Sequence, residues 1–364
     1  MSKNKALFSI SSLWLWHATR TLVVIKMYLS KNYEIDLISF WNALRFLKDE
    51  LKWEKVNFIE LDDYPNLERW TWFLFYFYLI KDILKSSIII RNEHLFVKKI
   101  ENNYDFIFSD GRYWIYSKVT PSFLLSHQLS FIMPKFFKYF NFISDYFNKK
   151  YLKNFKLVFI PDYNDFNKSL AWKLSHPKWI NSINHKYIWI LSSFSNIENK
   201  LDNDDKIDYL FIISWYLLEN KQNFVNKLIL QSNNLSWKKV FVLWDTSSYY
   251  KKELENNITI FSYISWKQRE FFLKNSSVII SRSWYTTIMD CIELNKKAIF
   301  FPTKNQTEQE YLSCFLKQKN YFIIWNNDFN LLKLVWKLNT CDNFNPISKT
   351  KYALENIEKI INNN

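Results

Sequence analysis

His17 is the histidine best placed for acid–base chemistry, because it directly follows the turn after a predicted buried strand, Ala6–Ile10. The free pKa of a histidine side chain lies near neutral pH, so the imidazole can take a proton from a hydroxyl and release it again. Asp110 and His127 also follow predicted strands in the first half of the chain and are alternative bases. The competing interpretation is a capping or structural histidine at position 17, and structural roles are favoured for the other two.

A second informative stretch runs from position 278 to 311 and predicts a strand, a helix and a second strand. Val278–Ser281 and Ala298–Phe301 are short apolar runs, as expected for buried parallel strands. The hydroxyls of Ser283, Thr286 and Thr287 lie at the start of the predicted helix between these two strands and can cap its N–H groups. Such a unit presents a helix N-terminus, which attracts anions, at the carboxyl edge of its sheet.

The turn before His17 and the turn into the helix after Val278–Ser281 contain tryptophan where glycine is expected. The chain has 364 residues with one glycine and 17 tryptophans, although ordinary usage of about 7% would give roughly 25 glycines. Trp284 stands at the turn into the second helix, where a bulky ring would block the helix N–H groups. Further tryptophans follow predicted strands or occupy turns, namely Trp14, Trp16, Trp41, Trp215, Trp237 and Trp244.

We interpret most of these tryptophans as glycines of the working protein, written as tryptophan because UGA codons were read with the wrong table. On that interpretation the first turn becomes S-S-L-G-L-G-H-A-T-R, a nest of N–H groups for a phosphate beside His17. The alternative is a protein that is truly rich in tryptophan and has an aromatic binding surface. The codons at positions 14, 16 and 284 discriminate between the two, and TGG there would exclude the first.

Strands and helices alternate along the whole chain, which predicts an α/β protein with two doubly wound parallel sheets. We expect a first domain over residues 1–170, a polar linker over 162–185 and a second domain over 186–349. The final helix, within 350–364, is expected to pack back on the first domain. Two such domains place their ligands between the carboxyl edges of their sheets.

Several motifs in this arrangement resemble those of glycosyltransferase family 28. This group includes the bacterial enzyme that adds N-acetylglucosamine to lipid-linked muramyl peptide. The motifs are S-R-S-W-Y-T-T-I-M-D at 281–290, P-T-K-N-Q-T-E-Q-E-Y at 302–311, D-G-R-Y-W-I-Y-S at 110–117, S-H-Q-L at 126–129 and the first loop through His17 and Arg20.

The resemblance implies the GT-B fold, a UDP-sugar donor held by the second domain, no metal or other cofactor, and inversion at the anomeric carbon. By motif position, His17 is the catalytic base and the first loop, Trp14, Trp16 and Arg20, faces phosphate or acceptor. Asp110 and His127 lie on the acceptor side. The expected donor-binding residues are Ser214, Trp215, Ile264, Ser283, Trp284, Thr286, Thr287, Asp290, Gln309 and Glu310.

Three of these positions have a specific expected role. Asp290 stands where the family usually has a glutamate for the ribose hydroxyls, and its shorter side chain makes uridine specificity less secure. Gln309 is expected at the sugar hydroxyls, with Glu310 in place of a second family glutamine. Ile264 is expected to present backbone groups to the base. Structural interpretations remain open, a solvated helix face for Asp290 and simple caps for the two threonines.

The composition limits the partners and the compartment. The formal net charge of +14 suits an anionic membrane surface or a phosphate-bearing substrate, although codon bias in an AT-rich gene would also enrich lysine. No nucleic-acid module or basic cluster stands out. Three cysteines without metal spacing, no spanning segment and no signal-peptide pattern predict a cytoplasmic protein that can lie peripherally on the inner face of the membrane.

The sequence therefore leaves three functions to separate. The first is an inverting glycosyltransferase that moves a hexose or N-acetylhexosamine from a UDP-sugar to a lipid-linked or envelope glycan. The second is a UDP-sugar 2-epimerase of the same architecture, which needs no acceptor. The third is a non-catalytic membrane- or glycan-binding protein, which requires the tryptophans to be real.

Overall fold

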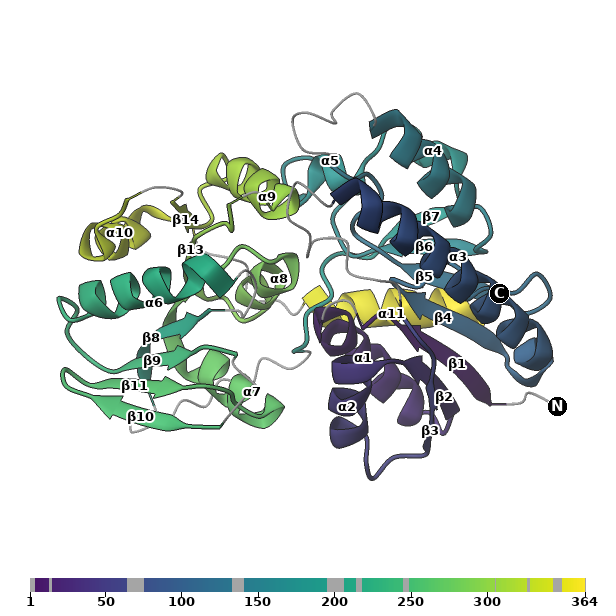
Figure 1. The fold of residues 1–364 in the computed structure, drawn as a ribbon, viewed down its shortest axis with the longest axis horizontal. Helices are drawn as coiled ribbons and strands as arrows, with labels where there is room; N and C mark the ends of the chain where they lie inside the picture. The colour runs from purple at the N-terminus through teal and green to yellow at the C-terminus, as the bar shows by residue number, and fades with distance from the viewer. Residues whose placement is uncertain are drawn as a thin grey trace.

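The computed structural model describes residues 4–12, 15–63, 75–132, 141–194, 206–213, 218–244, 249–304, 306–325, 328–342 and 349–363. Within them the chain forms two seven-stranded sheets in two domains, which lie side by side in Figure 1. This is the arrangement that the alternating pattern predicts.

The first sheet is parallel throughout and has the strand order β3-β2-β1-β4-β5-β6-β7. Its strands are β1 (Lys5–Ile10), β2 (Glu34–Ser39), β3 (Val56–Glu60), β4 (Phe106–Asp110), β5 (Ser122–Leu125), β6 (Leu157–Ile160) and β7 (His185–Tyr187). Its helices are α1 (Leu15–Leu29), α2 (Trp41–Glu50), α3 (Phe75–Ile100), α4 (Asn141–Leu152) and α5 (Trp172–Ser175).

The second sheet has the order β10-β11-β9-β8-β12-β13-β14 and is parallel except for the antiparallel pair β10–β11. Its strands are β8 (Ile207–Ile212), β9 (Lys239–Val242), β10 (Lys251–Leu254), β11 (Ile258–Phe261), β12 (Ser276–Ser281), β13 (Lys297–Phe300) and β14 (Ile323–Ile324). Its helices are α6 (Leu218–Ser232), α7 (Trp266–Asn275), α8 (Tyr285–Glu293), α9 (Thr307–Lys317) and α10 (Leu331–Lys337).

The central strands are apolar in sequence because both of their faces are covered. Successive side chains of a strand point to opposite faces, so Phe8 of β1 joins one core cluster of the first domain and Leu7 joins another. In the second domain Leu210 and Phe211 of β8 divide between two clusters in the same way.

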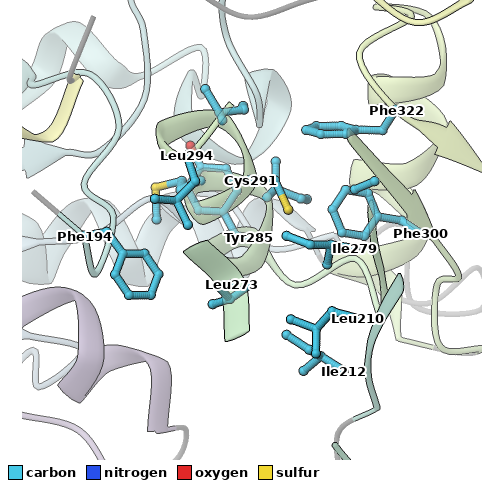
Figure 2. Packing of buried hydrophobic residues seen from close by; sticks show 14 of the residues in the cluster. Phe194, Leu210, Ile212, Leu273, Ile279, Tyr285, Cys291, Leu294, Phe300 and Phe322 are labelled. Carbon is cyan, nitrogen blue, oxygen red and sulfur yellow. The ribbon is translucent and has the colours of Figure 1, made fainter. Parts of the chain in front are cut away.

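Helix α8 packs into the larger of these second-domain clusters. Figure 2 shows Ile279 and Phe300 pointing from the sheet toward Cys291 of α8, and all three side chains are fully buried. Cys291 is thus a core residue, and burial raises the pKa of its thiol well above the usual value. The packing fixes the position of the helix whose N-terminus the sequence predicts as an anion site.

The final helix, α11 (Lys349–Asn362), crosses back to the first domain, as the sequence analysis expected (Figure 1). Ala353, Ile357 and Ile361 are spaced four residues apart, lie on one face of the helix and belong to the first domain's core cluster. An ion pair of 2.6 Å between Lys31 and Glu358 adds a surface contact.

The predicted boundary between the domains is wrong. The second domain was expected to span residues 186–349. However, β7, which ends at Tyr187, pairs with β6 at the edge of the first sheet. The stretch expected as a linker, 162–185, holds α5 and packs between the domains: the N–H groups of Leu129 and Ser130 donate to the carbonyl of Leu174, whose side chain lies in the core cluster of the second domain. A short edge strand after an irregular segment gives no sign of which sheet it joins, and pairing through the backbone decides it here.

The contact of α11 with the first domain can be tested by shortening one buried side chain. Ile357→Ala should lower the free energy of unfolding of the first domain by about 2–5 kcal/mol, because the cavity is surrounded by a packed core. Glu355→Ala, on the exposed face of the same helix, is the matched control and should stay within about 0.5 kcal/mol. Equal urea midpoints for the two variants would show that α11 does not hold this domain.

Candidate active site

His17 and Asp110 form a hydrogen-bonded pair at the carboxyl edge of the first sheet. The distance from Nδ1 of His17 to Oδ1 of Asp110 is 2.7 Å. His17 lies in the first turn of α1, and Asp110 is the last residue of β4, which pairs directly with β1. Because neighbouring parallel strands end at the same edge, residues 93 positions apart in sequence meet there.

The carboxylate of Asp110 is completely buried and accepts several further hydrogen bonds. Nε of Arg20 and Oγ1 of Thr21 both donate to its Oδ2 at 2.7 Å, and a second nitrogen of Arg20 donates to Oδ1. Burial alone would raise the pKa of Asp110, but the charge of Arg20 and the hydrogen bonds from Arg20 and His17 outweigh it and hold that pKa well below the usual range. Asp110 therefore stays ionised.

This contact sets the tautomer of His17. Nδ1 of His17 also lies 3.1 Å from Nη2 of Arg20, but its shorter contact is with the ionised carboxylate, which can only accept. We therefore assign the proton of the neutral ring to Nδ1 and the lone pair to Nε2. A histidine oriented in this way can take a proton through Nε2, and the carboxylate then stabilises the imidazolium that forms. The pair thus has the geometry of a general base and the group that orients it.

Gly111 makes the pair possible, and the sequence analysis did not single it out. It is the one glycine of the chain, directly follows Asp110 and has a φ of +75°. A β-carbon at this position would lie 2.9 Å from the Cβ of Ser11 and 3.1 Å from Cε1 of His17. Its isolation in a chain almost without glycine was the signal that could have identified it.

The polar network continues from Arg20 into the second domain through His127, two residues past the end of β5. Nη1 of Arg20 lies 3.1 Å from Nδ1 of His127, and Nε2 of His127 lies 3.1 Å from Oε1 of Glu308. An arginine only donates, so Nδ1 accepts and Nε2–H donates to the glutamate. His127 thus connects the two domains, and both of its nitrogens are occupied.

The ring of Tyr285, at the start of α8, stacks on His127 with centroids 4.2 Å apart and planes 2° apart. Its hydroxyl donates to the carbonyl of Pro161 at 2.7 Å. Burial lowers the pKa of His127, partly opposed by Glu308, so the ring is neutral at neutral pH. These contacts hold the N-terminus of α8 against the carboxyl edge of the first sheet.

The two turns that the sequence analysis assigned to phosphate face each other across the domain interface. The rings of Trp16 and Trp284 stack with centroids 4.4 Å apart and an interplanar angle of 36°. Trp284 is the N-cap residue of α8 and makes no side-chain cap. The rings fill the space between His17 and the helix N-terminus. Trp14 lies outside the described residues.

The remaining predicted donor residues differ in exposure. Thr286 and Thr287 are mostly buried in the first turn of α8. Ser283 is fully buried and donates to the carbonyl of Gln309 at 3.3 Å. Gln309 is fully buried, its Oε1 accepts from the N–H of Thr303 at 2.9 Å, and its Nε2 has no protein partner. That amide is the predicted sugar-contacting group.

Three other predicted positions contribute less to this arrangement. Glu310 is exposed, one residue past Gln309 on α9. Ile264 follows β11, and its side chain lies in the second domain's core. Ser214 and Trp215 lie outside the described residues. A depression lined by Tyr209 and other residues lies toward the opposite, amino-terminal edge of the second sheet and is not part of this site.

Asp290, which the resemblance assigns to the ribose, has both of its oxygens bonded to protein groups in this structure. Ser192 and the N–H of Ser193 donate to Oδ1 at 2.6 and 3.1 Å, and Arg269 donates to Oδ2 at 2.7 Å. Ser192 and Ser193 lead out of the first domain. Asp290 is fully buried and therefore anchors the interdomain connection on α8.

Glu293, one turn further along α8, anchors the returning connection. Its Oε2 accepts from the N–H of Lys349 at 3.1 Å and from the N–H and hydroxyl of Thr350 at 3.0 and 3.1 Å. The two connections also touch each other, since Ser192 N–H donates to the hydroxyl of Thr350 at 2.9 Å. Helix α8 thus carries both the candidate anion site and the anchors of the two connections.

Removing the partner of Asp110 tests the electrostatic account of the site. Arg20→Met should lower the free energy of unfolding by about 3–5 kcal/mol at neutral pH, because a buried carboxylate loses its countercharge. The pKa of Asp110 then rises above its unfolded value of about 3.9, so the variant regains stability as the pH falls through that raised pKa.

The measurement is the unfolding free energy of both proteins between neutral and acidic pH, with the surface variant Lys26→Met of the same helix as control. The gap between wild type and Arg20→Met should narrow toward acid. A gap that is constant with pH would show that the loss is one of packing and not of charge.

The second domain matches a known protein family, and the whole fold is similar to solved structures. Residues 217–362 match the model of the glycosyltransferase family 28 C-terminal domain. No curated relative matches the sequence significantly. The fold is similar to that of MurG from Acinetobacter baumannii, with 12% identity, a TM-score of 0.58 and 99% of each chain covered.

Two other solved structures share the fold over nearly the whole chain. The calicheamicin glycosyltransferase CalG4 gives a TM-score of 0.62 at 10% identity and covers 100% of this chain and 95% of its own. The kitacinnamycin glycosyltransferase gives 0.63 at 10% identity and covers 99% and 95%. The solved structures show that the chain has the GT-B fold, and the family-model match over residues 217–362 supports a glycosyltransferase.

Proposed function

We propose that this nucleotide-sugar-dependent glycosyltransferase moves a hexose or N-acetylhexosamine from a UDP-sugar to a hydroxyl of a lipid-linked or envelope glycan. The proposal includes inversion at the anomeric carbon and no metal or other cofactor. The observation that carries it is the stacking of Trp16, which directly precedes His17, on Trp284, the N-cap residue of α8, because it brings the His17–Asp110 pair near the N-terminus of α8. A proton acceptor and an anion site then stand on the two sides of one reaction centre.

The chemistry requires little more than these two parts. Nε2 of His17 takes the proton of the acceptor hydroxyl while its oxygen forms a bond to the anomeric carbon. The bond from that carbon to the diphosphate oxygen breaks, and the N–H groups and dipole at the start of α8 stabilise the leaving charge. Attack from the side opposite the leaving group inverts the anomeric centre.

The choice of UDP depends on the family resemblance and not on the solved structures. One structural neighbour is described with UDP-L-rhamnose and another with thymidine diphosphate. The buried side-chain nitrogen Nε2 of Gln309 has no protein partner and is the group that we assign to the sugar hydroxyls. Because Asp290 is occupied by the interdomain connection, the ribose must use other groups, or Asp290 must exchange partners when the donor binds.

Helix α4 of the first domain carries a surface suited to an anionic membrane. Phe142, Tyr146 and Phe147 of α4 are exposed, and Lys149 and Lys150 end the helix. Aromatic rings beside lysines are the pattern of a helix that lies in a lipid interface. No helix among the described residues has the length and apolarity needed to cross a bilayer. We propose that the protein meets a lipid-linked acceptor at this surface.

Product analysis tests the reaction. UDP-N-acetylglucosamine and UDP-glucose are offered with a polyprenyl-diphosphate-linked saccharide, to the chain as written and to the Trp16→Gly/Trp284→Gly form. Transfer with an inverted anomeric centre is expected from the Trp16→Gly/Trp284→Gly form, and little or none from the chain as written, because its two indole rings block the donor site. His17→Ala should lower kcat about 10²- to 10⁴-fold, whereas His185→Ala on the edge strand β7 should not. A 2-epimer formed from the donor alone, or a retained configuration, would contradict the proposal.

Vesicle binding tests the membrane surface separately. Phe142→Ser/Tyr146→Ser should weaken binding to phosphatidylglycerol vesicles roughly tenfold or more, since each large apolar side chain buried contributes about 1.5–3 kcal/mol. Leu230→Ser, an equally exposed apolar residue of the second domain, is the control and should bind as wild type. Equal binding to phosphatidylcholine vesicles would exclude the anionic component, and no loss in the double variant would exclude α4.

A further inference from the structure

Four tryptophans have a backbone conformation that tryptophan rarely adopts. Ten described residues other than glycine have a positive φ, and six of these are asparagines, which tolerate the left-handed region. The other four are Trp41, Trp189, Trp237 and Trp244, with φ of 46°, 67°, 82° and 52°. Apart from glycine, asparagine and tryptophan are the only residue types with a positive φ among the described positions.

The left-handed conformation brings Cβ too close to the following carbonyl, at a cost of roughly 1–2 kcal/mol per residue. Asparagine can offset this cost with local hydrogen bonds, but an indole ring cannot. Trp41 and Trp237 are 61% and 69% exposed, so packing does not compensate for them either. Glycine would adopt these backbone angles without strain.

The other two left-handed tryptophans are partly buried but lie at the same kind of place. Trp189 follows β7 and stacks on Tyr352, and Trp244 follows β9 near Tyr263. All four positions are strand ends, a helix start or a turn. These are the positions where glycine normally allows the chain to change direction.

The stacked pair in the interface leads to the same conclusion from a different observation. Trp16 and Trp284 occupy the space between His17 and the N-terminus of α8. Trp284 is only 5% exposed, and its ring stands where a diphosphate would reach the helix N–H groups. Residues without a side chain at both positions would open this space.

We infer that positions 16, 41, 189, 237, 244 and 284 are glycine in the working protein, and that each corresponds to a UGA codon that the organism reads as glycine. The assignment explains how a chain of 364 residues is written with one glycine and 17 tryptophans. For positions 16 and 284 the inference rests in part on the proposed function. For the other four it rests on backbone geometry alone. Described tryptophans outside the left-handed region, such as Trp336 in α10, are not covered by the φ argument.

Peptide mass spectrometry of the protein purified from its natural host tests the inference without any assay of function. Glycine is expected at 41, 189, 237 and 244, and at 16 and 284. Tryptophan in these peptides overturns the inference, position by position. If glycine is found but the Trp16→Gly/Trp284→Gly form does not bind UDP in a calorimetric titration, the proposed function fails while the inference stands.

Stability measurements on the recombinant chain test the geometric argument. Trp41→Gly and Trp237→Gly should unfold at higher temperatures than Trp41→Ala and Trp237→Ala, because only glycine relieves the left-handed strain. Trp336, 73% exposed on a helix, is the matched control, and there the alanine variant should be the more stable. Alanine variants that equal or exceed the glycine variants at 41 and 237 would overturn the argument.

Discussion

The buried charge of Asp110 is the interaction on which the candidate active site depends. A carboxylate without solvent is costly unless donors surround it, and here Arg20, Thr21 and His17 supply them. This requirement fixes the first turn of α1 against the end of β4. It also requires a residue without a β-carbon next to Asp110, which is Gly111. One electrostatic constraint thus positions the base, selects its tautomer and explains the only glycine.

Helix α8 has the corresponding position in the second domain. Its N-terminus faces the base, while Asp290 and Glu293 in the same helix hold the two chain segments that join the domains. A ligand that binds at the N-terminus of α8 therefore contacts the same helix that holds the two chain segments between the domains. The candidate site and both connections between the domains therefore share one short helix.

The sequence predicts most of the fold because buried parallel strands are written as apolar runs and their helices follow at regular intervals. It also predicts the residues at strand ends, so His17, Asp110 and His127 were found before the structure showed them meeting. The edge strand β7 was assigned to the wrong domain, since three residues, of which two are half-buried and one is exposed, are too few to show a periodic signal. The partners of Asp290 could not be predicted, because a family motif assigns a role and not the neighbours that compete for it.

The composition of the turns is the feature that neither the fold nor the motifs explain. Two indole rings stack at the interface where we propose that a diphosphate binds to the backbone. The central claim is that the space between His17 and the N-terminus of α8 is the donor site. A crystal structure of the Trp16→Gly/Trp284→Gly form with UDP tests this most directly. Our account predicts the β-phosphate against the first N–H groups of α8 with His17 opposite, and UDP ordered elsewhere on the second domain would contradict it.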